Sequence, residues 1–173
     1  PVVKASFSDV APDQGCFDAV EYVNAAGLMG GIGGGRFAPG AAVDRATLMT
    51  ILARMDGVDP AGGATWYEKG AAWAAENKVS DGADPDEILT RQEIAVMLWT
   101  YAQNKGFDVS VGEDTNILRY DDASAVEAWA VPAMQWACGA GIVKASGSSL
   151  NPGAEASRAE IAEILMRFCE NMK

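Results

Sequence analysis

Histidine is absent from this chain of 173 residues, and cysteine occurs only three times. Without histidine, the chain lacks the commonest general base and the commonest metal ligand of proteins. Cys16, Cys138 and Cys169 have neither the number nor the spacing of a disulfide framework or a zinc site. For Cys138 and Cys169 we favour buried apolar thiols over a disulfide between them, because free cysteine packs like a small hydrophobic residue. No metal or other cofactor is expected.

Positive charge and long apolar runs are also scarce. Thirteen lysines and arginines face 24 aspartates and glutamates, which gives a net charge of −11. This excess repels nucleic acid and anionic lipid at long range, although a local arginine cluster can still bind an anion. No run of 18 apolar residues occurs, so insertion into a membrane is not expected either. No signal peptide opens the chain at Pro1, and we expect a segment of a longer polypeptide.

What the sequence does contain is a pattern that recurs three times. Arg45, Arg91 and Arg158 are each followed by apolar or aromatic residues three, six, seven and ten positions later. The residues at these positions are Leu48, Ile51, Leu52 and Met55, then Ile94, Met97, Leu98 and Tyr101, then Ile161, Ile164, Leu165 and Phe168. This spacing is one face of an α-helix, and it predicts helices over 44–55, 90–104 and 157–172.

A further helix is predicted upstream of each arginine, over 17–26, 65–77 and 127–140. Each of these ends at a turn, whose residues are Gly27, Lys78 and Gly141. We therefore divide the chain into helix–loop–helix units 1–58, 59–105 and 120–173, with 106–119 as a linker or surface loop. One unit cannot bury its apolar face alone, so the three should share a core. The predicted fold is all-α, either a solenoid or a pseudo-threefold bundle.

The starts of the second helices carry the candidate chemistry. Thr90 with Glu93 and Ser157 with Glu160 have the spacing of capping boxes, and Asp44 can cap the first of these helices. The arginine that follows each cap places a positive charge at the positive end of the helix dipole, which is unfavourable. The same unfavourable placement at the same position of all three copies indicates a functional site. A guanidinium beside free first-turn N–H groups would bind an anion. We favour this role over an ion pair with a carboxylate of the neighbouring unit.

The ordered motifs resemble those of the S-layer homology (SLH) domain, a family usually found as three tandem copies. The segments that carry the resemblance are Phe7-Ser8-Asp9-Val10, Trp73, Trp136, Gly27-Leu28, Gly141-Ile142, Phe37-Ala38-Pro39, Thr90-Arg91-Gln92-Glu93 and Ser157-Arg158-Ala159-Glu160. The resemblance implies a pseudo-threefold prism in which the three second helices form a central bundle. It also implies grooves between adjacent repeats that bind secondary cell-wall polysaccharide, often pyruvylated.

Carried over to this sequence, the resemblance implies a set of ligand-binding positions. They are Arg45, Arg91 and Arg158, the hydroxyl residues Thr90 and Ser157, and the glycines Gly31 and Gly82. Asp9 and Asp122 are further candidates that could accept bonds from sugar hydroxyls, although we favour a role in bracing a loop. Asp44 and Ala145 depart from the hydroxyl and the glycine that the family prefers. We therefore expect unequal grooves, with the one around Thr90 and Arg91 as the first candidate.

Three functions are compatible with these features. The favoured one is a non-catalytic, extracellular module that attaches a larger surface protein to an anionic polysaccharide of the bacterial cell wall. The second is a protein–protein assembly module of a surface layer whose grooves bind nothing. The third, an enzyme, would need a pair of carboxylates, because no nucleophile stands beside an evident base. The acidic segment 81–87 does not follow the order of an EF-hand, and we interpret it as a solvated turn.

Overall fold

The computed structural model describes residues 4–110 and 115–172. In this part of the chain there is no β-strand, only isolated bridges, and the fold is all-α as predicted. The helices are α1 Phe17–Ala25, α2 Arg45–Met55, α3 Glu68–Glu76, α4 Arg91–Asn104, α5 Val131–Gly139 and α6 Arg158–Asn171. Short 3-10 turns, η1 Ile117–Arg119, η2 Ala123–Ala125 and η3 Ala128–Ala130, precede α5. None of the described helices combines the length and apolar character needed to cross a bilayer.

The predicted helix bounds hold within a few residues. The largest difference is in the third unit, whose first helix was expected to begin at residue 127. There the chain forms the single turn η3 and only then enters α5, with Pro132 in the first turn. Proline lacks an N–H and fixes φ, so it is tolerated in the first turn of a helix but not further in. The proline therefore marks where the continuous α-helix can begin.

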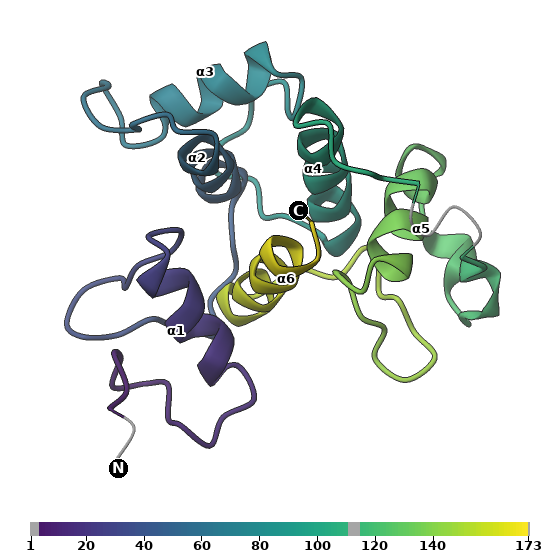
Figure 1. The fold of residues 1–173 in the computed structure, drawn as a ribbon, viewed down its shortest axis with the longest axis horizontal. Helices are drawn as coiled ribbons and strands as arrows, with labels where there is room; N and C mark the ends of the chain where they lie inside the picture. The colour runs from purple at the N-terminus through teal and green to yellow at the C-terminus, as the bar shows by residue number, and fades with distance from the viewer. Residues whose placement is uncertain (1–3, 111–114, 173) are drawn as a thin grey trace.

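The first helices of the units, α1, α3 and α5, are here called outer helices, and the second helices, α2, α4 and α6, inner helices. Each outer helix packs on the inner helix of the preceding unit and not on that of its own unit. Figure 1 shows α2, α4 and α6 towards the middle and α1, α3 and α5 around them. The close helix pairs are α2 with α3, α4 with α5, and α6 with α1. The last inner helix thus receives the first outer helix, and the chain closes on itself. An open solenoid, in which the end repeats stay apart, is ruled out.

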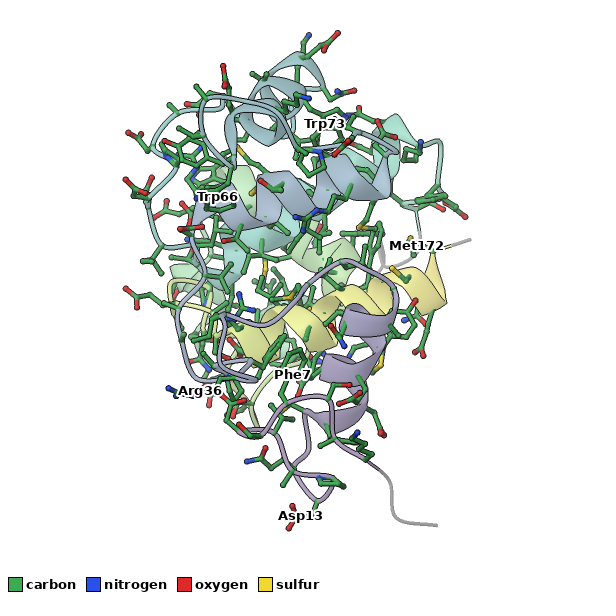
Figure 2. All side chains as sticks on the ribbon, turned by 90° about the vertical axis from the view of Figure 1, so that its left-hand side faces the viewer. Phe7, Asp13, Arg36, Trp66, Trp73 and Met172 are labelled. Carbon is green, nitrogen blue, oxygen red and sulfur yellow. The ribbon has the colours of Figure 1, made fainter. Side chains whose placement is uncertain are left out.

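The predicted apolar face forms the core. Eleven of its twelve positions are buried, and Met55 is half-buried against them. The ring of Phe168 on α6 lies 5.9 Å from that of Tyr101 on α4 and 6.3 Å from that of Trp136 on α5. Phe107, from the segment expected to be a linker or surface loop, lies 6.3 Å from the same ring, so this segment also contributes to the core. Figure 2 shows α2 and α6 lengthwise, with Trp73 and Met172 labelled.

A ring of backbone hydrogen bonds joins the three units just before their inner helices. The amide of Val43 donates to the carbonyl of Ala156, that of Ala156 to Leu89, and that of Leu89 to Val43, at 3.3, 3.1 and 2.9 Å. Each of these residues is 1% exposed and stands two positions before one of the three arginines. Because each unit gives one bond and receives one, no unit can leave without breaking two.

The three cysteines are free thiols, each half-buried, so the alternative of a Cys138–Cys169 disulfide is not realised. Burial raises the pKa of both the Cys138 and the Cys169 thiol. A raised pKa keeps a thiol protonated and unreactive, as expected of a residue that serves in packing.

The outer helices all end with a left-handed residue, and one of the three is not glycine. Gly27, Lys78 and Gly141 have φ of 71°, 58° and 73°. A side chain in this region meets the following carbonyl oxygen, which costs about 1 kcal/mol or more for residues other than glycine. Lys78 is therefore a strained position inside an otherwise regular repeat.

We predict that Lys78→Gly raises the free energy of unfolding by about 0.5 kcal/mol, because relief of the strain exceeds the added entropy of the unfolded chain. Urea denaturation measures the change. Ala72→Gly, at an exposed position within α3, is the control, and it should lower the stability by about 1 kcal/mol. A loss of stability in Lys78→Gly would contradict the prediction.

Candidate functional site

Each of the three arginines reaches from the start of an inner helix into the loop of the following unit. The buried guanidinium of Arg91 donates from Nε to the carbonyl of Leu150 at 2.9 Å and from Nη2 to that of Lys144 at 2.7 Å. Its Nη1 pairs with Glu160 at 2.8 Å. Arg158 repeats the pattern in the first unit, with bonds of 2.8 Å to the carbonyl of Phe37 and 2.6 Å to that of Gly30. These two arginines link neighbouring units.

Arg158 is further held by an aromatic ring. Its guanidinium carbon lies 4.7 Å from the centroid of the Phe37 ring, a cation–π contact. Burial lowers the pKa of Arg158.

Arg45 contacts side chains instead of backbone carbonyls. Its Nη2 donates to Ser80 Oγ at 2.9 Å and to Asp81 Oδ1 at 3.1 Å, and its Nη1 to Glu87 Oε2 at 3.2 Å. Asp84 lies 3.9 Å away. The second unit has a shorter loop here and lacks the small hairpin that the bridges at residues 33–36 and 146–149 form in the other two. The acidic segment predicted to be a solvated turn therefore supplies the carboxylates around this arginine.

The first-turn N–H groups of the inner helices are not free, which corrects the arrangement expected from the sequence. The amide of Arg45 donates to the carbonyl of Glu87 at 2.9 Å, and the amides of Arg91 and Arg158 do the same to the equivalent residues of the next unit. The amides one position later, in Ala46, Gln92 and Ala159, donate to the carbonyls of Pro85, Pro152 and Pro39. These donors join the units and are not available to an anion.

The capping residues behave as predicted. Ser157 accepts from the amide of Glu160 at 3.1 Å, and both Ser157 and Thr90 form complete capping boxes with the glutamate three positions later. Thr90 Oγ1 also donates to Glu93 Oε2 at 2.8 Å. Asp44 accepts from the amide and the hydroxyl of Thr47. Each of these side chains is therefore already engaged at a helix start.

Asp9 and Asp122 brace a loop, the role that was favoured. Asp9 accepts from the amides of Phe37 and Ala38, each at 2.8 Å. Asp122 accepts from those of Leu150 and Asn151 at 2.8 and 2.7 Å. Ala38 and Asn151 both have a left-handed φ, so the carboxylates hold a bend that is otherwise unfavourable. The bond from Phe37 lowers the pKa of Asp9, and the bond from Leu150 lowers that of Asp122.

Close contacts within the chain explain why Gly31 and Gly82 have no side chain. A Cβ on Gly31 would lie 2.8 Å from the Phe7 ring and from the carbonyl oxygen of Arg36. Gly82 has a φ of 77°, and its Cβ would lie 2.9 Å from the carbonyl oxygen of Ala71. The structure pairs the Gly82 segment with Arg45, the Ala145 segment with Arg91, and the Gly31 segment with Arg158. Each arginine thus contacts the loop of the next unit.

Two pockets lie near these loops, one between units and one within the third unit. The Trp129 pocket, about 190 Å³, has Arg45, Ser80, Glu93 and Trp129 as its polar and aromatic lining. Its apolar lining is Val79, Leu89, Val96 and Met97. The Lys144 pocket, about 610 Å³ and wider, is lined by Arg119, Tyr120, Lys144 and Ser148 together with Cys138 and Val143. The smaller of the two pockets thus has Arg45 in its lining, and neither pocket is lined by Arg91.

Sequence reasoning did not single out Trp129, Arg119 or Lys144. A signal for Trp129 was available, because it precedes Trp136 by as many residues as Trp66 precedes Trp73. Both Trp66 and Trp129 are more than half exposed, at 58% and 54%. No repeat pattern marks Arg119 and Lys144, which meet only because η1 folds against the loop after α5.

Comparison with known proteins fits this geometry. The sequence profile of the S-layer homology domain matches residues 6–49 and 119–162, together just over half of the chain. The chain belongs to the S-layer homology domain family. A relative, the "Surface-layer 125 kDa protein" of Lysinibacillus sphaericus, is 27% identical over 172 residues, which cover 90% of this chain and 14% of that protein. The two SLH matches fall on the first and third units, and each includes Asp9 or Asp122 and an inner-helix arginine.

We predict that Arg91→Lys lowers the free energy of unfolding by about 2–3 kcal/mol, because lysine cannot satisfy a buried carbonyl, a part-buried carbonyl and a carboxylate together. Arg45→Lys, whose acceptors are exposed, should cost less than about 1 kcal/mol. Urea unfolding of both variants measures the difference. Equal losses would contradict the distinction between the two arginines.

A second prediction concerns pH. The lowered pKa of Asp122 means that its bonds stabilise the fold above the ordinary value of 3.8, and this stabilisation is lost as pH falls through the lowered pKa. Asp122→Asn should therefore be less stable than the wild type at neutral pH, and the two should converge in strong acid. Thermal unfolding across pH measures this, with Asp9→Asn expected to behave alike. A gap that does not narrow as the pH is lowered would contradict the assignment.

Proposed function

We propose that this chain is a non-catalytic anchoring module that holds a larger surface protein on the outside of a bacterial cell wall. Its partner in this proposal is secondary cell-wall polysaccharide, bound non-covalently in grooves between repeats. The observation that carries the proposal is the SLH match on the first and third units, combined with one open pocket between units and a second within the third unit. The relative's printed name, a surface-layer protein, supports the same location.

The proposal includes a third, diverged SLH repeat at residues 59–105. The profile matches only the first and third units, but α3 and α4 occupy the same places in the closed ring as the other helix pairs. Thr90 and Glu93 keep the capping box, and Leu89 keeps its place in the backbone ring. Asp81, which binds the amide of Ala83, replaces the missing brace from an upstream aspartate.

An acidic sugar substituent, such as a pyruvate ketal, fits the Lys144 pocket best. Arg119 and Lys144 are exposed cations in a chain of net charge −11, and among the described residues no carboxylate lines this pocket. Asp121 lies at its rim, where it accepts from Ser148. Two cations against one carboxylate leave a local positive field, which attracts an anion that the rest of the surface repels. Arg45, Arg91 and Arg158, with Thr90, Ser157, Gly31 and Gly82, remain proposed groove residues around these pockets.

A second candidate function is assembly with other proteins of a surface layer. It is favoured by the internal bonds of Arg91 and Arg158, which already occupy the groups expected to face a glycan. In that case the wild type would self-associate and would not be retained by purified polysaccharide.

The test is retention on purified cell walls, together with the Kd for the released acidic polysaccharide. We predict that the double variant Arg119→Gln/Lys144→Gln binds about tenfold more weakly, because it loses two charge-assisted contacts at an exposed site. Lys4→Gln/Lys69→Gln removes the same charge at exposed positions that do not line the Lys144 pocket, and it is the matched control. Undiminished binding of the first variant would refute the assigned pocket.

A further inference from the structure

The Trp129 pocket differs from the Lys144 pocket in that its cation is paired with carboxylates. Its one cation, Arg45, is held by Asp81 at 3.1 Å and Glu87 at 3.2 Å, with Asp84 at 3.9 Å. Glu93 adds a further carboxylate to the lining. Three carboxylates therefore lie within 4 Å of one guanidinium, and a fourth lines the same pocket. An acidic ligand would have to enter against this field and compete for a cation that is already paired.

The remaining lining suits the apolar face of a sugar ring. Trp129 is 54% exposed and meets a lining that includes the buried Val79, Leu89 and Met97. Aromatic faces bind C–H-rich surfaces and cations through the negative face of the ring. A pyranose presents such a C–H face, and its volume is compatible with a pocket of about 190 Å³.

The polar groups of the pocket are matched to hydroxyl and amine donors. Ser80 Oγ accepts from Arg45 at 2.9 Å and from the amide of Gly82 at 3.3 Å, and its hydroxyl donates to the Asp81 carboxylate, so Ser80 is engaged within the chain. Within the described residues, both bonds to the Glu93 side chain from Thr90 end on Oε2, at 2.7 and 2.8 Å. Its other oxygen can accept from a ligand.

From these features we infer that the Trp129 pocket binds an amino sugar with a protonated amine, stacked on Trp129, and discriminates against acidic sugars. The inference rests on the proposed function in that it assigns a second sugar of the same wall polymer to this groove. In this arrangement the Lys144 pocket binds the acidic sugar and the Trp129 pocket binds the amino sugar. Glu93 is a specificity-determining residue in this arrangement.

Calorimetric titration of the full chain with three defined tetrasaccharides tests this. We expect glucosamine tetramer to bind most tightly, N-acetylglucosamine tetramer more weakly, and galacturonate tetramer not at the Trp129 pocket. Trp129→Ala should weaken glucosamine binding about tenfold. Trp66→Ala, the equivalent exposed tryptophan outside this pocket, keeps the same net charge and should have no effect. The pair separates the pocket from general attraction between a cationic oligosaccharide and an acidic protein.

Glu93→Gln can keep the capping box, since glutamine is also found at that position. It should reduce the preference for glucosamine over N-acetylglucosamine roughly threefold.

Equal glucosamine binding by wild type and Trp129→Ala would overturn the inference, as would galacturonate binding that Trp129→Ala abolishes. Cell-wall retention without glucosamine binding would overturn this inference alone, whereas glucosamine binding without retention would overturn the anchoring function alone.

Discussion

The fold depends on three backbone hydrogen bonds that run from unit to unit in a closed ring. Val43, Leu89 and Ala156 are buried, so an amide or carbonyl left without its partner there would cost free energy without compensation from water. The pairing sets the rotation of each inner helix relative to the next. It also fixes which loop lies beside each helix start, and hence where every arginine can reach.

The same arginine position is used in two ways because the loops differ in length. In the first and third units, a hairpin brings backbone carbonyls to Arg158 and Arg91, which become links between units. The second unit has no room for a hairpin, so Arg45 meets serine and carboxylate side chains, and a pocket remains open beside it. The difference in loop length thus replaces carbonyl acceptors by carboxylates and leaves a pocket beside the arginine.

The sequence was sufficient to predict the six helices, their caps and the buried face, because these depend on spacing within about ten residues. It was not sufficient to predict that α3 packs on α2 or α1 on α6, since an apolar face does not specify which other face covers it. The free first-turn amides were mispredicted for the same reason: the carbonyls of Pro39, Pro85 and Pro152 come from the adjacent unit. Trp129 lay within the repeat register, whereas Arg119 and Lys144 meet only in three dimensions.

Closure of α1 on α6 has a consequence for how such a module can change its number of units. The rotation from each unit to the next is set by one type of helix contact that occurs three times. The third of these contacts joins the last unit to the first. A fourth copy inserted by duplication would have no junction to enter, and a chain with one copy deleted would leave an outer and an inner helix uncovered. Gain or loss of single copies is therefore penalised at the level of folding, and duplication in whole sets of three is the route that this architecture leaves open.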